Sequence, residues 1–182
     1  MIKLRKIQKS DLKMRVEWMN NPIIYNNMHF TPPISFESTQ RWFEKNQDAT
    51  CRIDVAFDNE EGDVVAMGGL THIDYTVRKA EFYIFVNPNF LRRGYGSMSA
   101  YLLCKYGFEV LQLHKIYLFA NNGNIIARKT YEKLGFKLEG TMRHEMVRNE
   151  QYEDRLYYGL LASEFDHDKV ALRMVGCPSV DR

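Results

Sequence analysis

The segment from Arg92 to Ser97, which reads RRGYGS, contains the residue types needed to bind a phosphate group. Glycine adopts backbone conformations that let several N–H groups face one ligand, and the first turn of a helix leaves further N–H groups unpaired. A helix N-terminus is partly positive, and arginine pairs with phosphate oxygens. The segment follows an apolar run and precedes a helical one. Its residues alone predict either an anion site or a tight turn with solvated arginines.

This glycine loop differs from the common nucleotide-binding motifs. It lacks the Gly-Lys-Ser/Thr ending of a Walker loop and the three spaced glycines of a dinucleotide-binding turn. It resembles the pyrophosphate-binding signature of the GNAT superfamily of N-acetyltransferases, which reads Gln or Arg, two variable residues, Gly, a variable residue, and Gly or Ala. Here the frame from Leu91 to Gly96 reads LRRGYG, so Leu91 departs from the usual first residue. Because backbone groups form the cradle, we expect weaker anchoring at Leu91, or a compensating contact, rather than loss of binding.

A second segment, NIIARKTYEKLGF from Asn124 to Phe136, resembles another signature of the same superfamily. The two signatures stand in the expected order, with a strand-like apolar run between them. The resemblance covers residues 2–161 and is strongest to the branch of ribosomal-protein N-terminal and spermidine acetyltransferases. It implies a single α/β (α+β) domain over residues 1–165, followed by a C-terminal tail over 166–182. In such a domain a mixed, mostly antiparallel seven-stranded sheet with splayed central strands is flanked by helices.

The resemblance also implies that acetyl-CoA donates the acetyl group and that a primary amine attacks it directly in a ternary complex. Tyr131 matches the position that protonates or hydrogen-bonds the departing thiolate. Glu81 lies on the strand that often carries the general base, which acts directly or through water. A neutral phenol can donate a proton, and an alkylamine needs a base because it is protonated at neutral pH. From the residues alone, Tyr131 could instead be a core tyrosine, and Glu81 could pair with a nearby cation.

Two further groups of residues are expected to bind the substrates. The expected acetyl-CoA contacts, among which Asn124 can also cap its helix, are Phe85, Val86, Arg92, Arg93, Gly94, Tyr95, Gly96, Ser97, Asn124 and Ala127. The expected contacts of the amine acceptor are Tyr25, His29, Phe30 and His72. For the aromatic residues of this second group the alternative is a place in the core or in a lid, and for the histidines it is a structural or surface role.

The acceptor is expected to be a small molecule such as an amino sugar nucleotide, or a protein N-terminus. A polyamine needs an acidic pocket, and residues 25–36 contain no carboxylate, so spermidine is the less favoured alternative. An alternative of another class is a regulatory domain that binds CoA without catalysis. The presence of Tyr131, Glu81 and both loop glycines favours an enzyme.

Composition argues against several other classes of protein. A net charge of +2 over 182 residues is too small for the basic bias of a nucleic-acid-binding domain. No apolar run reaches the ~20 residues of a membrane span, and no signal peptide is evident, so a cytoplasmic protein without membrane contact is expected. Three widely spaced cysteines and unpaired histidines predict neither a disulfide framework nor a metal site. By resemblance, a homodimer is expected.

Periodicity and breaker residues predict the elements that position these groups. Gly68-Gly69 predicts a bend or bulge within one strand, and Gly135 predicts the end of a helix. The strands are predicted near 2–7, 50–57, 64–73, 78–86 and 114–120, from 136 onward, and over 152–161. The helices are predicted over 10–19, 35–46, 95–110 and 124–134. A short helix or a loop is predicted over 22–30, and a short helix over 170–175.

Overall fold

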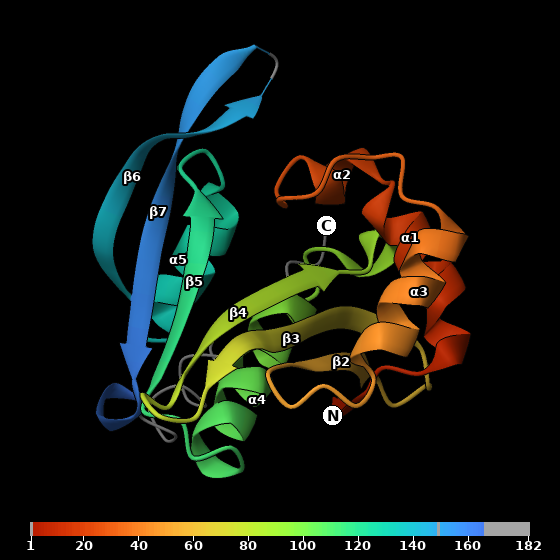
Figure 1. The fold of residues 1–182 in the computed structure, drawn as a ribbon, viewed down its shortest axis with the longest axis horizontal. Helices are drawn as coiled ribbons and strands as arrows, with labels where there is room; N and C mark the ends of the chain where they lie inside the picture. The colour runs from red at the N-terminus through yellow and green to blue at the C-terminus, as the bar shows by residue number, and fades with distance from the viewer. Residues whose placement is uncertain (1, 149, 166–182) are drawn as a thin grey trace.

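The computed structural model of the protein describes residues 2–148 and 150–165, and the predicted tail helix over 170–175 lies outside them. The described strands form one sheet, in the order β1-β2-β3-β4-β5-β7-β6 (Figure 1). The strands are β1 (Lys3–Lys6), β2 (Ile53–Asp58), β3 (Val64–Asp74), β4 (Lys79–Val86), β5 (Lys115–Asn121), β6 (Lys137–Arg148) and β7 (Gln151–Leu161). The helices are α1 (Leu12–Met19), α2 (Pro22–Tyr25), α3 (Phe36–Asn46), α4 (Tyr95–Glu109) and α5 (Ile125–Lys133), with short 3₁₀ turns at Lys9–Asp11, Pro88–Phe90 and Ala162–Glu164. None of these helices has both the length and the apolar character to cross a membrane.

The sheet divides between β4 and β5, which are its one parallel pair among the described strands. The ladder between them has three residue pairs and ends where Glu81 faces Tyr117. Beyond this fork β4 stays paired with β3 up to Val86, and β5 stays paired with β7 up to Asn121. The two strands therefore diverge (Figure 1), which confirms the predicted splay in a mixed, mostly antiparallel seven-stranded sheet.

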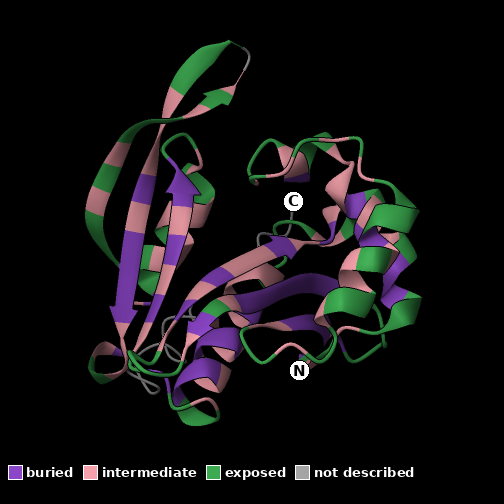
Figure 2. Cartoon of the chain, viewed as in Figure 1, coloured by how far each residue is buried: buried purple, intermediate pink, exposed green. Residues whose placement is uncertain are grey.

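Two hydrophobic clusters cover opposite faces of the sheet. The larger cluster packs α4 and α5 against one face and includes Phe82 and Leu103. The smaller cluster packs α1 and the segment after α2 against the other face and includes Trp18 and Phe85. Phe82 and Phe85 differ by three positions on β4, so they point to opposite sides, as alternation requires. Figure 2 shows the central strands as largely buried between these layers.

The predicted bend or bulge at Gly68-Gly69 is wrong. The pairing of β3 with both neighbours continues through the two glycines without a shift of register. Gly69 lies in register between Asp54 on β2 and Tyr83 on β4, and a Cβ on Gly69 would lie 2.7 Å from Cε1 of Tyr83. The missing side chain lets the Tyr83 ring cross β3, so that its hydroxyl donates a hydrogen bond to Asp54 Oδ1. Close approach, rather than a bulge, explains glycine here.

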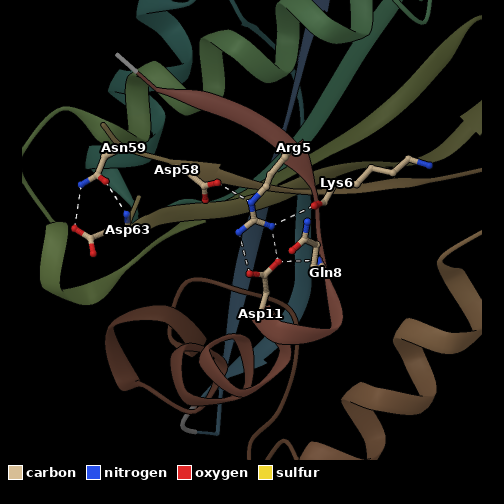
Figure 3. Close-up of polar contacts among 7 residues, drawn as sticks. All are labelled: Arg5, Lys6, Gln8, Asp11, Asp58, Asn59 and Asp63. Atoms are coloured by element: carbon tan, nitrogen blue, oxygen red, sulfur yellow. Dashed lines mark hydrogen bonds and ion pairs between the residues drawn. The ribbon is translucent and has the colours of Figure 1, made fainter. Parts of the chain in front are cut away.

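Arg5 ties the first strand to the start of α1 (Figure 3). Its guanidinium donates to both carboxylate oxygens of Asp11, at 2.7 and 3.0 Å, and its Nε donates to Asp58 at 2.6 Å. The hydrogen bond to Asp11 outweighs burial and, together with that to Asp58, raises the pKa of Arg5 above its ordinary value. The Asp11 side chain is only 5% exposed, so this ion pair holds α1 over one face of the sheet.

Candidate active site

The glycine loop lies at the N-terminus of α4, where the sequence predicts it. Gly94 is the N-cap residue with a φ of +80°, which favours glycine, and no atom lies within 4 Å of the position of a Cβ there. Arg92 and Arg93 beside it are exposed, and neither forms an ion pair with another described residue. The loop therefore combines unpaired N–H groups, two arginines and open space, and its residues fit a pyrophosphate group.

Close packing of α4 places this loop beside the unpaired end of β4. A Cβ on Gly96 would lie 3.1 Å from Cγ2 of Val86. The backbone of Phe85 and Val86 pairs with β3 on one side and lies past the fork on the other. An extended substrate arm that leaves the loop can therefore reach free backbone groups of β4.

Glu81 lies at the fork itself, opposite Thr71 on β3 and Tyr117 on β5. Its Oε2 is 3.0 Å from Nδ1 of His72, and the side chains of Glu81 and His72 are 24% and 74% exposed. A half-buried carboxylate at the end of the ladder, in contact with an exposed imidazole, can accept a proton and pass it toward solvent. The structure thus brings together two residues that the sequence predicts separately.

Tyr131 lies on α5, half-buried in the larger cluster. Its ring centroid is 5.9 Å from that of Phe82 and 5.9 Å from that of Phe136. Burial, with a smaller contribution from Cys104, raises the pKa of Tyr131 above its ordinary value, so the phenol keeps its proton at neutral pH. Its hydroxyl forms no hydrogen bond to a described residue. Because Phe82 follows Glu81 on β4, Tyr131 packs on the sheet face opposite to Glu81.

A cavity of about 630 Å³ opens among the segment after α2, the β5–α5 loop and the β6–β7 hairpin. Asn26, Asn121, Asn124 and Arg148 contribute to its lining. Asn121 Nδ2 lies 3.5 Å from the carbonyl oxygen of Asn26, which links the β5 arm of the fork to the segment after α2. The space is large enough for a small substrate at the Asn121 end of β5.

Comparison with known proteins decides the family. Residues 2–137 match the family model described as an acetyltransferase (GNAT) domain. The chain belongs to the GNAT acetyltransferase family. It is therefore an acetyl-CoA-dependent N-acetyltransferase, and the family prediction drawn from the glycine loop and the Asn124–Phe136 segment is confirmed.

Relatives of this GNAT acetyltransferase confirm the predicted branch. The chain is 31% identical over 157 residues to spermidine N(1)-acetyltransferase of Escherichia coli (strain K12), an alignment that spans 85% of this chain and 83% of the relative. It is 31% identical over 109 residues to the putative ribosomal N-acetyltransferase YdaF of Bacillus subtilis (strain 168), with 60% of each chain covered. The crystal structure of spermidine N-acetyltransferase from Vibrio cholerae in complex with CoA and spermine superimposes with a TM-score of 0.87 at 27% identity, covering 90% of this chain and 96% of that one.

In this GNAT enzyme the predicted acceptor residues are scattered. His72 contacts Glu81, whereas Phe30 packs against the smaller hydrophobic cluster. Burial, followed by the charges of Arg155 and Arg148, lowers the pKa of His29 to about 4, so His29 is neutral and lies near the β6–β7 hairpin. Tyr25 ends α2, and no ring contact or side-chain hydrogen bond links it to a described residue of the fork. The roles of all four residues in binding stay predictions.

The segment from Asn124 to Phe136 has the local structure that its residues predict. Asn124 caps α5 by accepting a hydrogen bond from the N–H of Ala127 at 3.2 Å, and Gly135 follows the helix with a φ of +101°. In the first segment, Tyr95 and Ser97 lie in the half-buried first turn of α4. Their contacts with acetyl-CoA remain predictions.

Sequence reasoning missed an aromatic wall on the Glu81 face of the GNAT fork. Tyr117 and Phe119 of β5 meet Tyr157 of β7, with ring centroids 5.5 and 5.3 Å from that of Tyr157. They lie on the Glu81 face because Tyr117 is opposite Glu81. The alternation of residues along β5 could have predicted this wall. Ile116, Leu118 and Ala120 are apolar and buried, whereas Tyr117 and Phe119 between them are half-buried.

Proposed function

We propose that Glu81 and Tyr131 act as general base and general acid when this enzyme acetylates a primary amine. One observation supports the assignment most strongly: the two side chains lie on opposite faces of the sheet, Glu81 at the fork and Tyr131 on the ring of Phe82. The amine can then approach from the Glu81 face while the thiol departs toward the Tyr131 face. A carboxylate and a protonated phenol suit these two roles.

Acetyl-CoA would use three features of the enzyme. Its pyrophosphate would bind the backbone N–H groups and arginines of the segment from Arg92 to Ser97. Its pantetheine arm would enter between β4 and β5 and pair with the free backbone of Phe85 and Val86, where N–H groups can polarise the thioester carbonyl. Asn124 and Ala127, at the start of α5, would border the same arm.

The chemistry follows from this placement. Glu81, directly or through water, removes a proton from the acceptor ammonium, and His72 can carry that proton to solvent. The free amine attacks the carbonyl carbon; the C–N bond forms and the C–S bond breaks. Tyr131 gives its proton to the departing sulfur and regains one as the new amide loses its excess proton. The thiol of CoA and the N-acetylated product leave.

We infer that the acceptor is a small molecule such as an amino sugar nucleotide, with a protein N-terminus as an alternative of the same chemistry. The wall formed by Tyr117, Phe119 and Tyr157 supports an acceptor with a ring that can stack. Spermidine is the second candidate, because the relatives from Escherichia coli and Vibrio cholerae are named spermidine N-acetyltransferases.

A panel of amines tests these candidates. Thiol release from acetyl-CoA would be measured with polyamines, peptides with free N-termini and amino sugar nucleotides. We expect the highest kcat/KM with an amino sugar nucleotide. The highest kcat/KM with spermidine would instead establish the second candidate, and tight acetyl-CoA binding without transfer to any amine would refute the proposed roles of Glu81 and Tyr131.

We also propose that the enzyme works in the cytoplasm as a homodimer, without nucleic-acid or membrane partners. The near-neutral balance of 25 basic and 23 acidic residues supports independence from nucleic acid. Sedimentation of the purified protein would show whether the dimer forms in solution.

A further inference from the structure

Two buried polar atoms on one face of the sheet have no hydrogen-bond partner among the described residues. One is Nε of Arg155 on β7, and the other is Oδ1 of Asn121 on β5. The two residues are directly opposed in the antiparallel pair of β5 and β7. Their side chains therefore leave the sheet on the same side and lie next to each other. Asn121 is only 4% exposed.

Strand register and a ring contact place Arg155 on the Glu81 face. Its Cζ lies 4.4 Å from the ring centroid of Phe119. Phe119 is two residues after Tyr117 on β5, so the two side chains lie on the same face of the sheet. Tyr117 is opposite Glu81 at the fork. In Figure 1, β5 and β7 run together as the arm of the sheet that diverges from β4. Arg155 and Asn121 thus lie on the Glu81 face of that arm, from which the amine would approach.

The guanidinium of Arg155 is a donor without an acceptor in the described part of the protein. No side-chain hydrogen bond or ion pair joins it to another described residue. Burial lowers the pKa of Arg155, and Glu81 and Glu145 offset this only by attraction at a distance. A buried Nε–H without an acceptor is costly, and a carboxylate or phosphate would satisfy it with charge-assisted N–H···O bonds.

We propose that Arg155 binds a carboxylate or phosphate of the acceptor, while Asn121 Oδ1 accepts a hydrogen bond from a hydroxyl or N–H of the same molecule. This rests on the proposed acetyl transfer at the fork and specifies its substrate class: a primary amine that also carries an oxyanion. The Phe119 ring packs against the guanidinium and keeps its N–H donors directed at the anion. Binding at the β7 arm leaves the amine free to reach Glu81.

The charges around Arg155 and the β6–β7 hairpin agree with an anionic acceptor. Burial is the main cause that lowers the pKa of His29 to about 4, and the smaller contributions of Arg155 and Arg148 indicate a positive potential there. Among the carboxylates nearby, Glu153 lies 3.9 Å from Arg148, and Asp154 accepts a backbone N–H at 2.9 Å. Glu145 attracts Arg155 only at a distance, without a hydrogen bond or ion pair to it. A polyamine would bring further ammonium groups next to Arg155 and would be repelled.

Two pairs of matched amines test the site. Ethanolamine and phosphoethanolamine differ by a phosphate, and propylamine and β-alanine differ by a carboxylate. In the parent enzyme, kcat/KM should be at least about tenfold higher for the anionic member of one pair or both, since one charge-assisted bidentate contact is gained. The pair with the larger ratio identifies the preferred oxyanion. Arg155→Met should bring both ratios to about one, mainly through KM of the anionic amine.

Control variants separate recognition from folding. Arg143→Met removes the same charge from an exposed position of β6 and should preserve the ratios. Arg155→Lys keeps a charge without the planar fork, so it should keep part of the preference even if Arg155→Met folds poorly. Asn121→Asp adds a negative charge of nearly equal shape and should lower kcat/KM for phosphoethanolamine.

Equal kcat/KM for both members of each pair in the parent enzyme would overturn the proposal. An equal fall in kcat/KM for both amines of each pair in Arg155→Met would also overturn it. Calorimetric titration of phosphoethanolamine into the CoA-bound protein tests the site without chemistry. Binding that is lost in Arg155→Met, together with no transfer to any amine, would support the anion site while refuting the proposed function; no binding to the parent would overturn the anion site.

Discussion

Tyr131→Phe tests the proposed proton donor with little disturbance of the core. The substitution removes one hydroxyl, which bonds to no described residue. It keeps the ring, whose centroid is 5.9 Å from those of Phe82 and Phe136. Because these packing contacts persist, we expect the free energy of unfolding to change by less than about 1 kcal/mol.

The expected effect of this substitution on turnover is much larger. Burial raises the pKa of Tyr131, so the phenol carries its proton throughout the neutral range and is ready to protonate the leaving thiolate. Proton transfer from a positioned side chain contributes about 100-fold or more, so kcat should fall by at least that factor, or about 2.7 kcal/mol of activation free energy. The Kd of acetyl-CoA should change by less than about threefold, because the hydroxyl acts mainly in the transition state.

Thiol release with a chromogenic disulfide reagent gives kcat, and calorimetric titration gives the Kd of acetyl-CoA. Tyr101→Phe is a matched control, because Tyr101 is another half-buried tyrosine of the same cluster on α4. Its kcat should stay close to that of the parent. A kcat of Tyr131→Phe within about twofold of the parent would refute the reasoning, since the rate expected of a missing acid is far lower.

Three further predictions address the general base Glu81, the glycine loop and His29. Glu81→Gln should lower kcat/KM about 100-fold or more at neutral pH, and the loss should shrink as pH approaches the pKa of the amine; a loss that does not vary with pH would count against a base. Gly94→Val should weaken acetyl-CoA binding in calorimetry by at least about tenfold, whereas Gly62→Val, at a similarly strained φ of +86°, should leave it unchanged; unchanged affinity in Gly94→Val would exclude the loop as the cradle. The pKa of His29 is lowered from 6.5 to about 4 on folding, so protonation of the unfolded chain costs stability as pH falls through that window. His29→Gln should therefore raise Tm relative to the parent near pH ~5 but not near pH ~8, and an equal difference at both would refute the linkage.

Local features of this GNAT domain could be predicted because their physics is short-range. Asn124 caps α5 and Gly135 ends it through contacts within a few residues. Ser35 likewise caps α3 by accepting the N–H of Ser38 at 3.1 Å. The glycine loop depends on the same kind of information, since a strand, a glycine turn and a helix follow one another directly in the chain.

The error at Gly68-Gly69 has a physical cause. Glycine in a strand marks either a bulge or a close approach by another group, and both have the same sequence pattern. Only the register of three strands shows that the ring of Tyr83 crosses Gly69 to reach Asp54. That register depends on residues far apart in the chain, so local sequence does not specify it.

The family, the acyl donor and the two helices that carry the loop and Tyr131 could be predicted from the sequence, because contiguous motifs encode them. The end of the β4–β5 ladder is visible only in the folded protein, which places Glu81 at the fork and Tyr131 on the other face of the sheet. The tertiary structure also places Arg155 beside Asn121, thirty-four positions apart in the chain, with buried polar atoms that no described residue satisfies. Strand pairing over such separations is set by the packing of the whole sheet, and no local pattern of residues reports it.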